Sequence, residues 1–500
     1  MQTITIHGRR TLHGSIRPAA AKNSTLPLLA ATLLCDGPCR LRDVPRLADV
    51  DTSLALLDAV GARVRRCGAD LCTRPADRLC GDIPEHLAGA MRSSVFYLAP
   101  LLCRVGYVRL PLPGGCRLGP RPVDIHLAGL AAMGAEVELE GIAVTLRRTG
   151  PLHGVDFTLR LPSVGATMTL LMAACCAAGQ TVLRGAAQEP EIGDMIAFLS
   201  ACGADIQGAG TPVLTVQGGR PLGGAFHRPL PDRIAAATYA AALACAGGQI
   251  EIAGCDPASY DSFLRFLTGT GVQVSRAGDC VRLARDPAVP LRGGAHLRAD
   301  AWPAFATDTA PLAAAVLLTA AGESEIYDSL FANRFACAAG FAAMGAACTV
   351  RGRQLTLPGG AVLHGTDVTA PDLRGGAALL AAALAADGET AGMKIYPPHC
   401  AGWGQRFPET ARRLPLTLHH RAGHARPLRG SRPGTRPIMA APLLKFFTFL
   451  HKVCSFALKT QSLSRPALSK RAGQAVFFYE FLAKVLKLRG KFAILINSYM

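Results

Sequence analysis

Aromatic residues are scarce in this sequence. They make up 6% of the 500 residues, with two Trp and eight Tyr, whereas apolar residues of all kinds reach 50%. The apolar residues are therefore mostly Ala, Leu and Val, a composition that suits many small helices packed on sheets. The length excludes one small domain and predicts two or more.

Acidic residues are nearly missing from the last part of the chain. Residues 412–500 contain 17 Lys and Arg but one acid, Glu480, whereas the other 411 residues contain 36 basic and 34 acidic residues. A body so close to neutral argues against nucleic acid as its partner. Lysines such as Lys445 and Lys484 interrupt the apolar stretches of the tail, which argues against a membrane span. Contact of basic amphipathic helices with a membrane surface stays open as the less favoured alternative.

The sequence has no Cys-x-x-Cys pair among its 17 cysteines and no secretory signal peptide. Many cysteines lie within apolar, helix-like runs, among them Cys35, Cys175 and Cys202. We therefore interpret them as reduced, mostly buried thiols of a cytoplasmic protein, and we expect no metal site.

A repeated unit runs through the body of the chain. Six apolar, helix-like runs end at glycine, a helix C-cap signal, and continue into a strand-like run. They are residues 24–41, 92–110, 166–183, 235–252, 309–327 and 375–395. A second helix type ends at Gly61, Gly134, Gly203, Gly271 and Gly345, which are 73, 69, 68 and 74 residues apart. Such even spacing predicts one supersecondary unit used six times, with the sixth incomplete because its glycine is missing near Leu414.

A glycine-flanked cysteine lies in residues 113–126, which read PGGCRLGPRPVDIH. Glycines let a loop approach a ligand closely. Arg117 and Arg121 supply positive charge, which favours the thiolate of Cys116 and binds anions. The alternative is a glycine turn with a bystander cysteine, and these residues alone favour neither.

Polar residues recur at the start of the first helix type. They are Lys22, Asn23, Arg92, Ser163, Asp308 and Arg374. Taken singly, each is more often a helix cap or a solvated charge than a ligand. If the units face each other, however, these starts converge. Together they predict a cleft for a strongly anionic substrate, with Asp308 as the candidate base.

Several short segments accompany the cysteine loop. They are 21–23 (AKN), 49–52 (DVDT), 91–94 (MRSS), 163–167 (SVGAT), 189–192 (EPEI), 231–234 (PDRI), 307–308 (TD), 333–335 (NRF) and 372–374 (DLR). With these segments the chain resembles the enolpyruvyl transferase family, and within it the UDP-N-acetylglucosamine 1-carboxyvinyltransferases of peptidoglycan synthesis. The resemblance runs to about residue 398. The cysteine loop is its most specific part, because the related shikimate enzymes share the six-unit fold without it.

The resemblance implies an inside-out α/β barrel of two pseudo-symmetric domains with three repeated units each. Residues 1–21 and 231–411 would form the first domain, and residues 22–230 the second. Residues 412–500 would be an irregular basic extension, poorly ordered or helical. Phosphoenolpyruvate and UDP-N-acetylglucosamine would bind between the domains, with no metal ion and no organic cofactor.

The resemblance also implies roles for single residues. Cys116 would be the general acid that protonates the enol carbon, or would form an adduct with phosphoenolpyruvate. Asp308 would be the base near the sugar 3′-hydroxyl. The implied substrate-binding residues are Lys22, Asn23, Arg92, Arg121, Pro122, Val123, Asp124, Ile125, Pro162, Ser163, Val164, Gly165, Leu330 and Arg374.

The chain departs from the family pattern in several places. Leu161 stands for a lysine, Ala235 for an acidic residue and Ala332 for a glutamate. In the last repeat, residues 399–406 read HCAGWGQR. No arginine stands where the family's arginine would contact phosphoenolpyruvate, and Arg406 lies too far along the chain to match it. The leading hypothesis is enolpyruvyl transfer to the 3′-hydroxyl of UDP-N-acetylglucosamine with release of phosphate. Two alternatives stay open: a different nucleotide acceptor, or a catalytically impaired relative that binds ligand.

Overall fold

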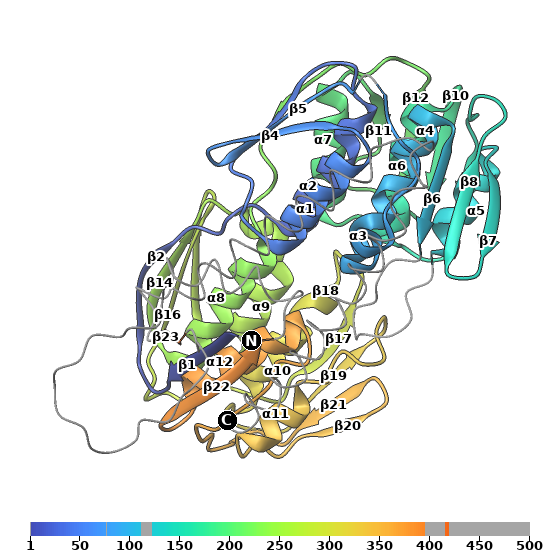
Figure 1. Ribbon diagram of the computed structural model, residues 1–500. Coiled ribbons are helices and arrows are strands. Elements are labelled where there is room, and N and C mark those ends of the chain that lie inside the picture. The colour runs from blue at the N-terminus through green and yellow to red at the C-terminus, as the bar shows by residue number, and fades with distance from the viewer. Residues whose placement is uncertain (1, 77, 112–122, 396–415, 420–500) are drawn as a thin grey trace, which may run out of the picture. The chain divides into compact units, whose positions relative to one another are not determined.

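The computed structural model describes residues 2–76, 78–111, 123–395 and 416–419 (Figure 1). By its internal contacts the chain divides into residues 1–421 and 422–500. The first of these parts contains every described residue. In it, one arrangement of helix and small sheet recurs six times, as the even spacing of the glycines predicts.

The first three units occupy residues 22–227. Unit one contains α1 (Lys22–Ala31), η1 (Thr32–Leu34), β3 (Cys39–Leu41), α2 (Ala48–Ala59), β4 (Arg63–Cys67) and β5 (Asp70–Arg74). Unit two contains α3 (Glu85–Ala90), η2 (Arg92–Tyr97), α4 (Leu98–Val105), β6 (Tyr107–Pro111), α5 (Asp124–Ala132), β7 (Glu136–Glu140) and β8 (Ala143–Arg147). Unit three contains β9 (Asp156–Thr158), α6 (Val164–Cys176), β10 (Gly179–Arg184), α7 (Pro190–Ala201), β11 (Asp205–Gln207), β12 (Val213–Gly218) and β13 (Phe226–His227).

The last three units follow from residue 233. Unit four contains α8 (Arg233–Ala246), β14 (Gly248–Ala253), η3 (Pro257–Tyr260), α9 (Asp261–Gly269), β15 (Gln273–Ala277) and β16 (Cys280–Arg285). Unit five contains β17 (His296–Asp300), β18 (Phe305–Ala306), η4 (Thr307–Thr309), α10 (Ala310–Leu317), β19 (Ser324–Asp328), α11 (Ala338–Ala343), β20 (Thr349–Arg351) and β21 (Gln354–Leu357). Unit six contains α12 (Leu373–Ala385), β22 (Glu389–Ile395) and β23 (Leu416–His419), and the chain starts with β1 (Gln2–His7) and β2 (Leu12–Ile16).

Each unit has its own sheet. In unit order the strands run β13-β3-β5-β4, β6-β8-β7, β11-β12-β10-β9, β15-β16-β14-β2, β18-β17-β19-β21-β20 and β22-β1-β23. Three strands complete sheets of units far away in the sequence. β13 pairs parallel with β3, β2 pairs parallel with β14, and β1 pairs antiparallel with both β22 and β23.

The helices of the first type form the interior. All residues of α10 are buried, and in α12 all residues from Gly375 to Leu384 are buried. α8, α10 and α12 contact one another. Because most of their residues are alanine, the three helices can approach one another closely. Buried helices with sheets built around them are the inside-out α/β arrangement that the sequence predicts.

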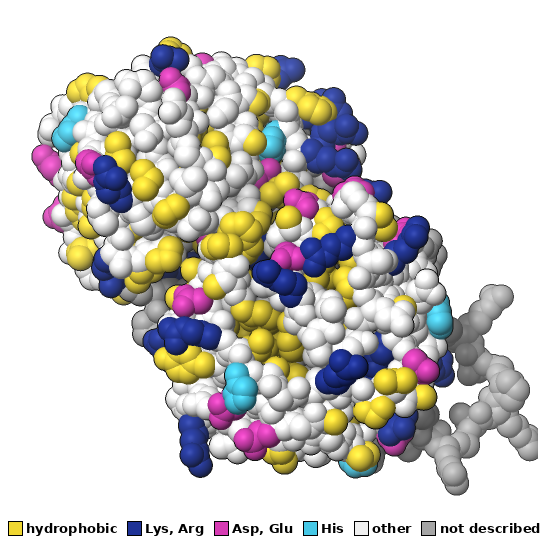
Figure 2. All heavy atoms as spheres, turned by 180° about the vertical axis from the view of Figure 1, so that it is seen from behind, with side chains coloured by type: hydrophobic (Ala, Val, Ile, Leu, Met, Phe, Trp, Pro, Cys, Tyr) yellow, Lys and Arg dark blue, Asp and Glu magenta, His cyan; other side chains and the backbone are white. Residues whose placement is uncertain are grey.

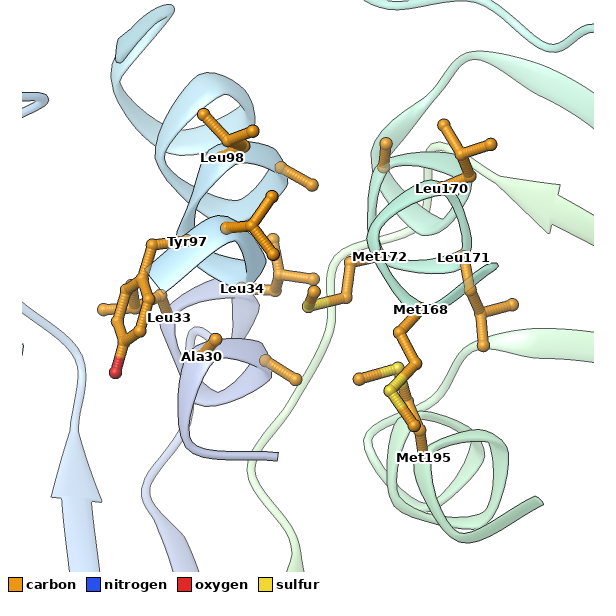
Figure 3. Packing of buried hydrophobic residues seen from close by; sticks show 14 of the residues in the cluster. Ala30, Leu33, Leu34, Tyr97, Leu98, Met168, Leu170, Leu171, Met172 and Met195 are labelled. Carbon is orange, nitrogen blue, oxygen red and sulfur yellow. The ribbon is translucent and has the colours of Figure 1, made fainter. Parts of the chain in front are cut away.

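Two hydrophobic cores occur in the described part of the chain. One is built from residues 26–222, and the other from residues 4–12 together with 236–386. In the first core, Met172 of α6 points toward Leu34, and Met168 lies beside Met195 of α7 (Figure 3). The separation of the cores favours the predicted domain limits, which stay a prediction.

The chain passes between the two cores at two places that lie side by side. Ala20 forms an antiparallel bridge with Pro231. The N–H of Ala21 donates to the carbonyl of Leu230 at 2.7 Å, and the N–H of Asp232 donates to the carbonyl of Ala19 at 2.8 Å. The two crossings are therefore held together by backbone hydrogen bonds.

The five glycines of the second helix type have the backbone conformation that their position predicts. Their φ angles are +89°, +101°, +106°, +97° and +95° for Gly61, Gly134, Gly203, Gly271 and Gly345. Residues other than glycine rarely adopt such φ angles, which is why a glycine ends each of these helices.

The basic extension begins with a strand that no pattern in the sequence predicts. In β23, Leu416 lies opposite Ile6 and His419 opposite Thr3. Residues 420–500 lie outside the described part, so the prediction for them stays a prediction. Among the described residues, no helix combines the length and the apolar character needed to cross a membrane. On the face shown in Figure 2, basic and acidic side chains are interspersed.

Candidate active site

The starts of three buried helices meet at Asp308. Arg374, in the first turn of α12, donates from Nε to Oδ1 of Asp308 at 3.0 Å. Nη1 of Arg334 lies 3.6 Å from the same oxygen. Arg233, the first residue of α8, adds its charge to the surroundings of this carboxylate. The structure thus brings together Asp308 and Arg374, two residues that the sequence analysis singled out.

Aspartates cap two of these helices and fix where their arginines lie. The carboxylate of Asp372 accepts from the N–H groups of Arg374 and Gly375 at 2.8 and 3.0 Å. Asp232 does the same for α8 and accepts from Ala235 at 2.9 Å. Such a cap contributes about 1 kcal/mol and satisfies N–H groups that the helix leaves free. Each cap places an arginine on the first helical turn.

Arg334 is the most deeply buried cation of this group. Its side chain is 1% exposed, and its Nε donates to the Thr307 hydroxyl at 3.0 Å. Its guanidinium carbon lies 4.4 Å from the centre of the Phe331 ring. Nη1 is buried and makes no hydrogen bond to any described residue. A buried guanidinium with an unused donor is suited to accept an anionic ligand.

Leu330 is connected to the same group through Asp328. The N–H of Leu330 donates to Asp328 at 2.9 Å, and Asp328 also accepts from the Thr307 hydroxyl. Arg334 Nε is 3.5 Å from the Asp328 carboxylate. Leu330 itself is 37% exposed. The predicted contact residue Leu330 is therefore held next to the arginine group, with its side chain accessible.

Three arginines determine the charge state of Asp308. Burial opposes its ionisation, but the charges of Arg374, Arg334 and Arg233 outweigh burial and hold the pKa of Asp308 well below its usual range. Asp308 is therefore a carboxylate in this arrangement. It is a poor proton acceptor as long as the guanidinium groups stay in contact with it.

At the start of α1, the predicted anion ligand Lys22 already has a counter-ion. Its Nζ donates to the carboxylate of Asp49 in α2 at 2.8 Å. Asn23 follows it in the same turn, and both residues are half-buried. An anion that binds Lys22 would compete with Asp49.

Arg92 and Gly165 both lie near a buried histidine, His126. Burial first, and the charge of Arg92 second, lower the pKa of His126 to about 4, so His126 is neutral at pH 7. His126 Nδ1 hydrogen-bonds with the Thr169 hydroxyl of α6 at 3.0 Å. A Cβ on Gly165 would lie 3.0 Å from the His126 ring. Gly165 therefore allows the start of α6 to lie against α5.

Two groups of predicted substrate-binding residues, around Asp124 and around Ser163, are linked by an ion pair. Asp124, the first residue of α5, accepts from Arg160 at 2.5 Å. Arg160 precedes Pro162 and Ser163, and Ser163 caps α6 by accepting from the N–H of Ala166 at 3.3 Å. The remaining members of the two groups are buried or half-buried (Val123, Ile125 and Val164). Leu161, which stands for the family's lysine, is 41% exposed.

Other predicted residues lie outside the described part of the chain. They are Cys116, Arg121 and Pro122, together with residues 399–406. The sequence analysis gave no role to Arg233, Arg334 or Glu191, although all three belong to segments that carry the resemblance. Their signal was present in the segments PDRI, NRF and EPEI.

A buried ion pair links the two cores. Nε of Arg233 donates to both carboxylate oxygens of Glu191, at the start of α7, at 3.1 and 3.2 Å. The pair borders a cavity of about 270 Å³ that is also lined by Glu189, Ser259 and Trp302. Burial raises the pKa of Glu189 to about 7. Among the described residues, no predicted site residue lines this cavity.

Comparison with known proteins gives one family. The family described as EPSP synthase (3-phosphoshikimate 1-carboxyvinyltransferase) matches residues 6–409. The UDP-N-acetylglucosamine 1-carboxyvinyltransferase of Acidiphilium cryptum is 40% identical over 399 residues, which cover 79% of this chain and 94% of that protein. The protein of the same name from Rhodospirillum centenum is 39% identical over 407 residues, with the same coverage.

Solved structures agree in fold. The enolpyruvyl transferase NikO from Streptomyces tendae superimposes with a TM-score of 0.75 at 24% identity, covering 84% of this chain and 98% of that chain. EPSP synthase from Acinetobacter baumannii gives a TM-score of 0.64 at 16% identity, covering 84% of this chain and all of that one. At these identities the likeness concerns the fold alone.

Proposed function

This chain belongs to the enolpyruvyl transferase family described as EPSP synthase, and on that premise we propose that it transfers the enolpyruvyl group of phosphoenolpyruvate to the 3′-hydroxyl of UDP-N-acetylglucosamine. Phosphate is the second product, and the reaction is the first committed step of peptidoglycan synthesis. The observation that supports this most is the carboxylate of Asp308 surrounded by Arg374, Arg334 and Arg233. It offers a base and dense positive charge at one point.

The chemistry requires a proton donor, a proton acceptor and cations. The acceptor hydroxyl adds to C2 of phosphoenolpyruvate while C3 gains a proton. The tetrahedral intermediate then loses phosphate and a C3 proton, which restores the double bond. We assign the proton donor to Cys116, the acceptor of the hydroxyl proton to Asp308, and the holding of phosphate and carboxylate to Lys22, Arg121 and Arg374. No step requires a metal ion or organic cofactor.

Binding of phosphoenolpyruvate would also activate Asp308. The carboxylate and phosphate of phosphoenolpyruvate would compete with two protein carboxylates for their cations. Asp308 accepts from Arg374 at 3.0 Å, and Asp49 accepts from Lys22 at 2.8 Å. When Arg374 turns toward the substrate, the pKa of Asp308 rises, because part of the charge that depresses it is now neutralised. The base becomes effective only when the anionic substrate is present.

The acceptor is proposed from the relatives. Proteins named for UDP-N-acetylglucosamine share 38–40% identity with this chain over 92–94% of their lengths. A different nucleotide acceptor stays the second candidate, because Leu161 replaces a lysine beside Ser163 and is exposed. A catalytically impaired relative is the third, since no arginine stands at the place in the last repeat where the family has one.

We further propose that the protein works in the cytoplasm and has no nucleic-acid partner. The fourteen described cysteines are free thiols, as in proteins of reducing compartments. The substrates are its partners, and a membrane role of the tail has no support beyond its basic charge.

The test is phosphate release from phosphoenolpyruvate with UDP-N-acetylglucosamine. We expect release from the wild type and from Cys80→Ala, an exposed cysteine that serves as control, but not from Cys116→Ala. Shikimate 3-phosphate and other uridine nucleotides are compared as acceptors. Release with one of these, and none with UDP-N-acetylglucosamine, would reject the proposed acceptor. Binding without turnover for every acceptor would identify an impaired relative.

A further inference from the structure

Three buried cysteines from two separate stretches of the chain meet at one point. The Sγ atoms of Cys35, Cys39 and Cys202 all lie within 4.8 Å of one another, and those of Cys35 and Cys202 are 3.5 Å apart. The three residues are 2%, 2% and 4% exposed. We propose that these thiols, the thiol triad, bind one soft, thiophilic metal ion as a three-thiolate complex.

The spacing of the sulfur atoms suits one ion. A metal–sulfur bond of about 2.3 Å places three sulfurs around one ion at roughly 3.8–4.0 Å from one another. The triad lies close to this range, so small side-chain rotations are sufficient to close the complex. Rigid elements hold each thiol: Cys35 and Cys202 directly follow η1 and α7, and Cys39 is the first residue of β3.

The donor set selects the kind of ion. Among the described His, Cys, Asp and Glu residues, only the triad groups its ligand atoms so closely. Thiolate donors without imidazole or carboxylate favour soft ions such as Cu⁺, Zn²⁺ and Cd²⁺ over Mg²⁺ or Ca²⁺. Three buried thiolates alone would be costly to desolvate, and a divalent ion reduces their net charge to −1. A fourth coordination position would remain for a small exogenous ligand.

The triad lies one residue layer below the surface. Asp36, Pro38 and Gly203, which neighbour the three cysteines in sequence, are exposed. The loop of residues 36–38 lies very close to the backbone at Gly224, since a Cβ on Gly37 would lie 2.4 Å from the Gly224 backbone nitrogen. A shallow, tightly covered site allows an ion to enter by local opening and then keeps it out of water.

The position of the triad gives the ion a structural effect. Helices α1 and α7 contact each other, and their first turns carry Lys22 and Glu191. The triad lies at the other end, where α7 ends and where η1 continues α1 as far as Leu34. An ion bound at the triad would join the ends of both helices and hold β3 to them. Metal binding should therefore stabilise the folded protein.

A disulfide between Cys35 and Cys202 is the competing interpretation of the short contact. It would require an external oxidant that accepts two electrons and two protons, and it would leave Cys39 without a function. A metal ion uses all three thiols and releases their protons without oxidation. The two interpretations therefore differ in the number of thiols used and in the mass of the chain.

The test uses the full-length protein, reduced with a phosphine and titrated with Cd²⁺ as a redox-inert probe. Ultraviolet absorption reports thiolate-to-cadmium charge transfer, and Zn²⁺ is the competitor. We expect a site for one Cd²⁺ per chain that is lost in Cys39→Ala and in Cys202→Ala. It should be kept in Cys245→Ala, a matched control with a buried helical cysteine in α8. Saturating Cd²⁺ should raise the Tm of wild type and control by about 5 °C, but not that of the triad variants.

Two results would overturn the proposal. One is equal Cd²⁺ binding by Cys39→Ala and Cys245→Ala, which would assign the signal to other thiols. The other is a loss of two mass units without phosphine, together with no cadmium signal in its presence, which would show a disulfide only. Cys39→Ser serves if the alanine variant does not fold, and phosphate release reports independently on folding of every variant.

Discussion

Arg374 donates from Nε to Oδ1 of Asp308 at 3.0 Å, although 66 residues separate them in the sequence. The same oxygen is 3.6 Å from Arg334, so one carboxylate is the counter-ion of two guanidinium groups. An anionic ligand and Asp308 therefore compete for the same cations. This competition can be measured without turnover.

Replacing Asp308 with Asn should abolish turnover and improve anion binding. Loss of the base should lower phosphate release by about 10²–10⁴-fold. Because Arg374 then loses the carboxylate that accepts from its Nε, and Arg334 keeps only Asp328 as a counter-ion, inorganic phosphate should raise the Tm of Asp308→Asn more than that of the wild type. Thermal melts with phosphate, against sodium chloride at equal ionic strength, measure this. Asp367→Asn, at an exposed position, is the control, and equal shifts in all three proteins would contradict the competition.

The ion pair between Glu191 and Arg233 should matter far more than an exposed pair. Glu191→Gln leaves the Arg233 charge buried, so we expect a loss of about 3–5 kcal/mol in the free energy of unfolding. The double variant Glu191→Gln/Arg233→Met should lose less than the sum of the single variants. Urea unfolding measures each corner of the cycle.

The exposed pair of Arg282 and Glu251, at 2.9 Å, is the matched control for this cycle. Its rupture should cost much less stability, because water and salt screen both charges. Similar losses for the two pairs would mean that the buried pair does not hold the two cores together.

Glu189 should make the protein less stable as the pH rises. Its pKa is raised from 4.5 to about 7 by burial, so the folded state holds this proton more tightly than the unfolded state. The penalty is absent below pH 4.5, grows between pH 4.5 and 7, and is complete above pH 7. Glu189→Gln should therefore have a higher free energy of unfolding than the wild type, and this difference should be about 2 kcal/mol larger at pH 8 than at pH 5. Glu323→Gln, at an exposed position, is the control. If both variants change the free energy of unfolding equally at each pH, the prediction is wrong.

The basic extension should be dispensable beyond its first strand. The chain divides at residues 421 and 422, and β23 ends at His419. A chain that ends at His419 should keep the Tm and the rate of phosphate release of the full chain. A chain that ends at Leu414 should melt at a lower temperature, because β1 loses its pairing with β23. Sedimentation with anionic vesicles tests membrane contact, and equal sedimentation of full-length and shortened chains would remove that role from the tail.

Local signals made the fold predictable. Gly61 and Gly134 end helices with positive φ, a requirement of single residues that the sequence displays directly. The exchange of strands was not predictable, because nothing in Phe226–His227 or Leu416–His419 indicates a partner in another unit. The six-unit pattern therefore came from the sequence, and the strand partners came from the structure.

The candidate site was also predictable only in part from the sequence. Asp308 and Arg374 were found because each begins a repeated helix. Arg334 was not given a role, since its importance comes from burial and from its distance to Asp308, which depend on the tertiary structure. The absence of Cys-x-x-Cys hid the thiol triad, because Cys35 and Cys202 are 167 residues apart.

The central strand of the β22-β1-β23 sheet leaves the ribosome long before its two neighbours. At about 5–20 residues per second, translation of the intervening chain takes roughly 20–80 s. During that time the core of residues 26–222 can close on its own, because it is continuous in the sequence. The nascent N-terminus must meanwhile keep Ile4 and Ile6, which end up buried, in a form that neither aggregates nor pairs wrongly. The sheet around β1 can therefore form only after residues 389–419 have been synthesised.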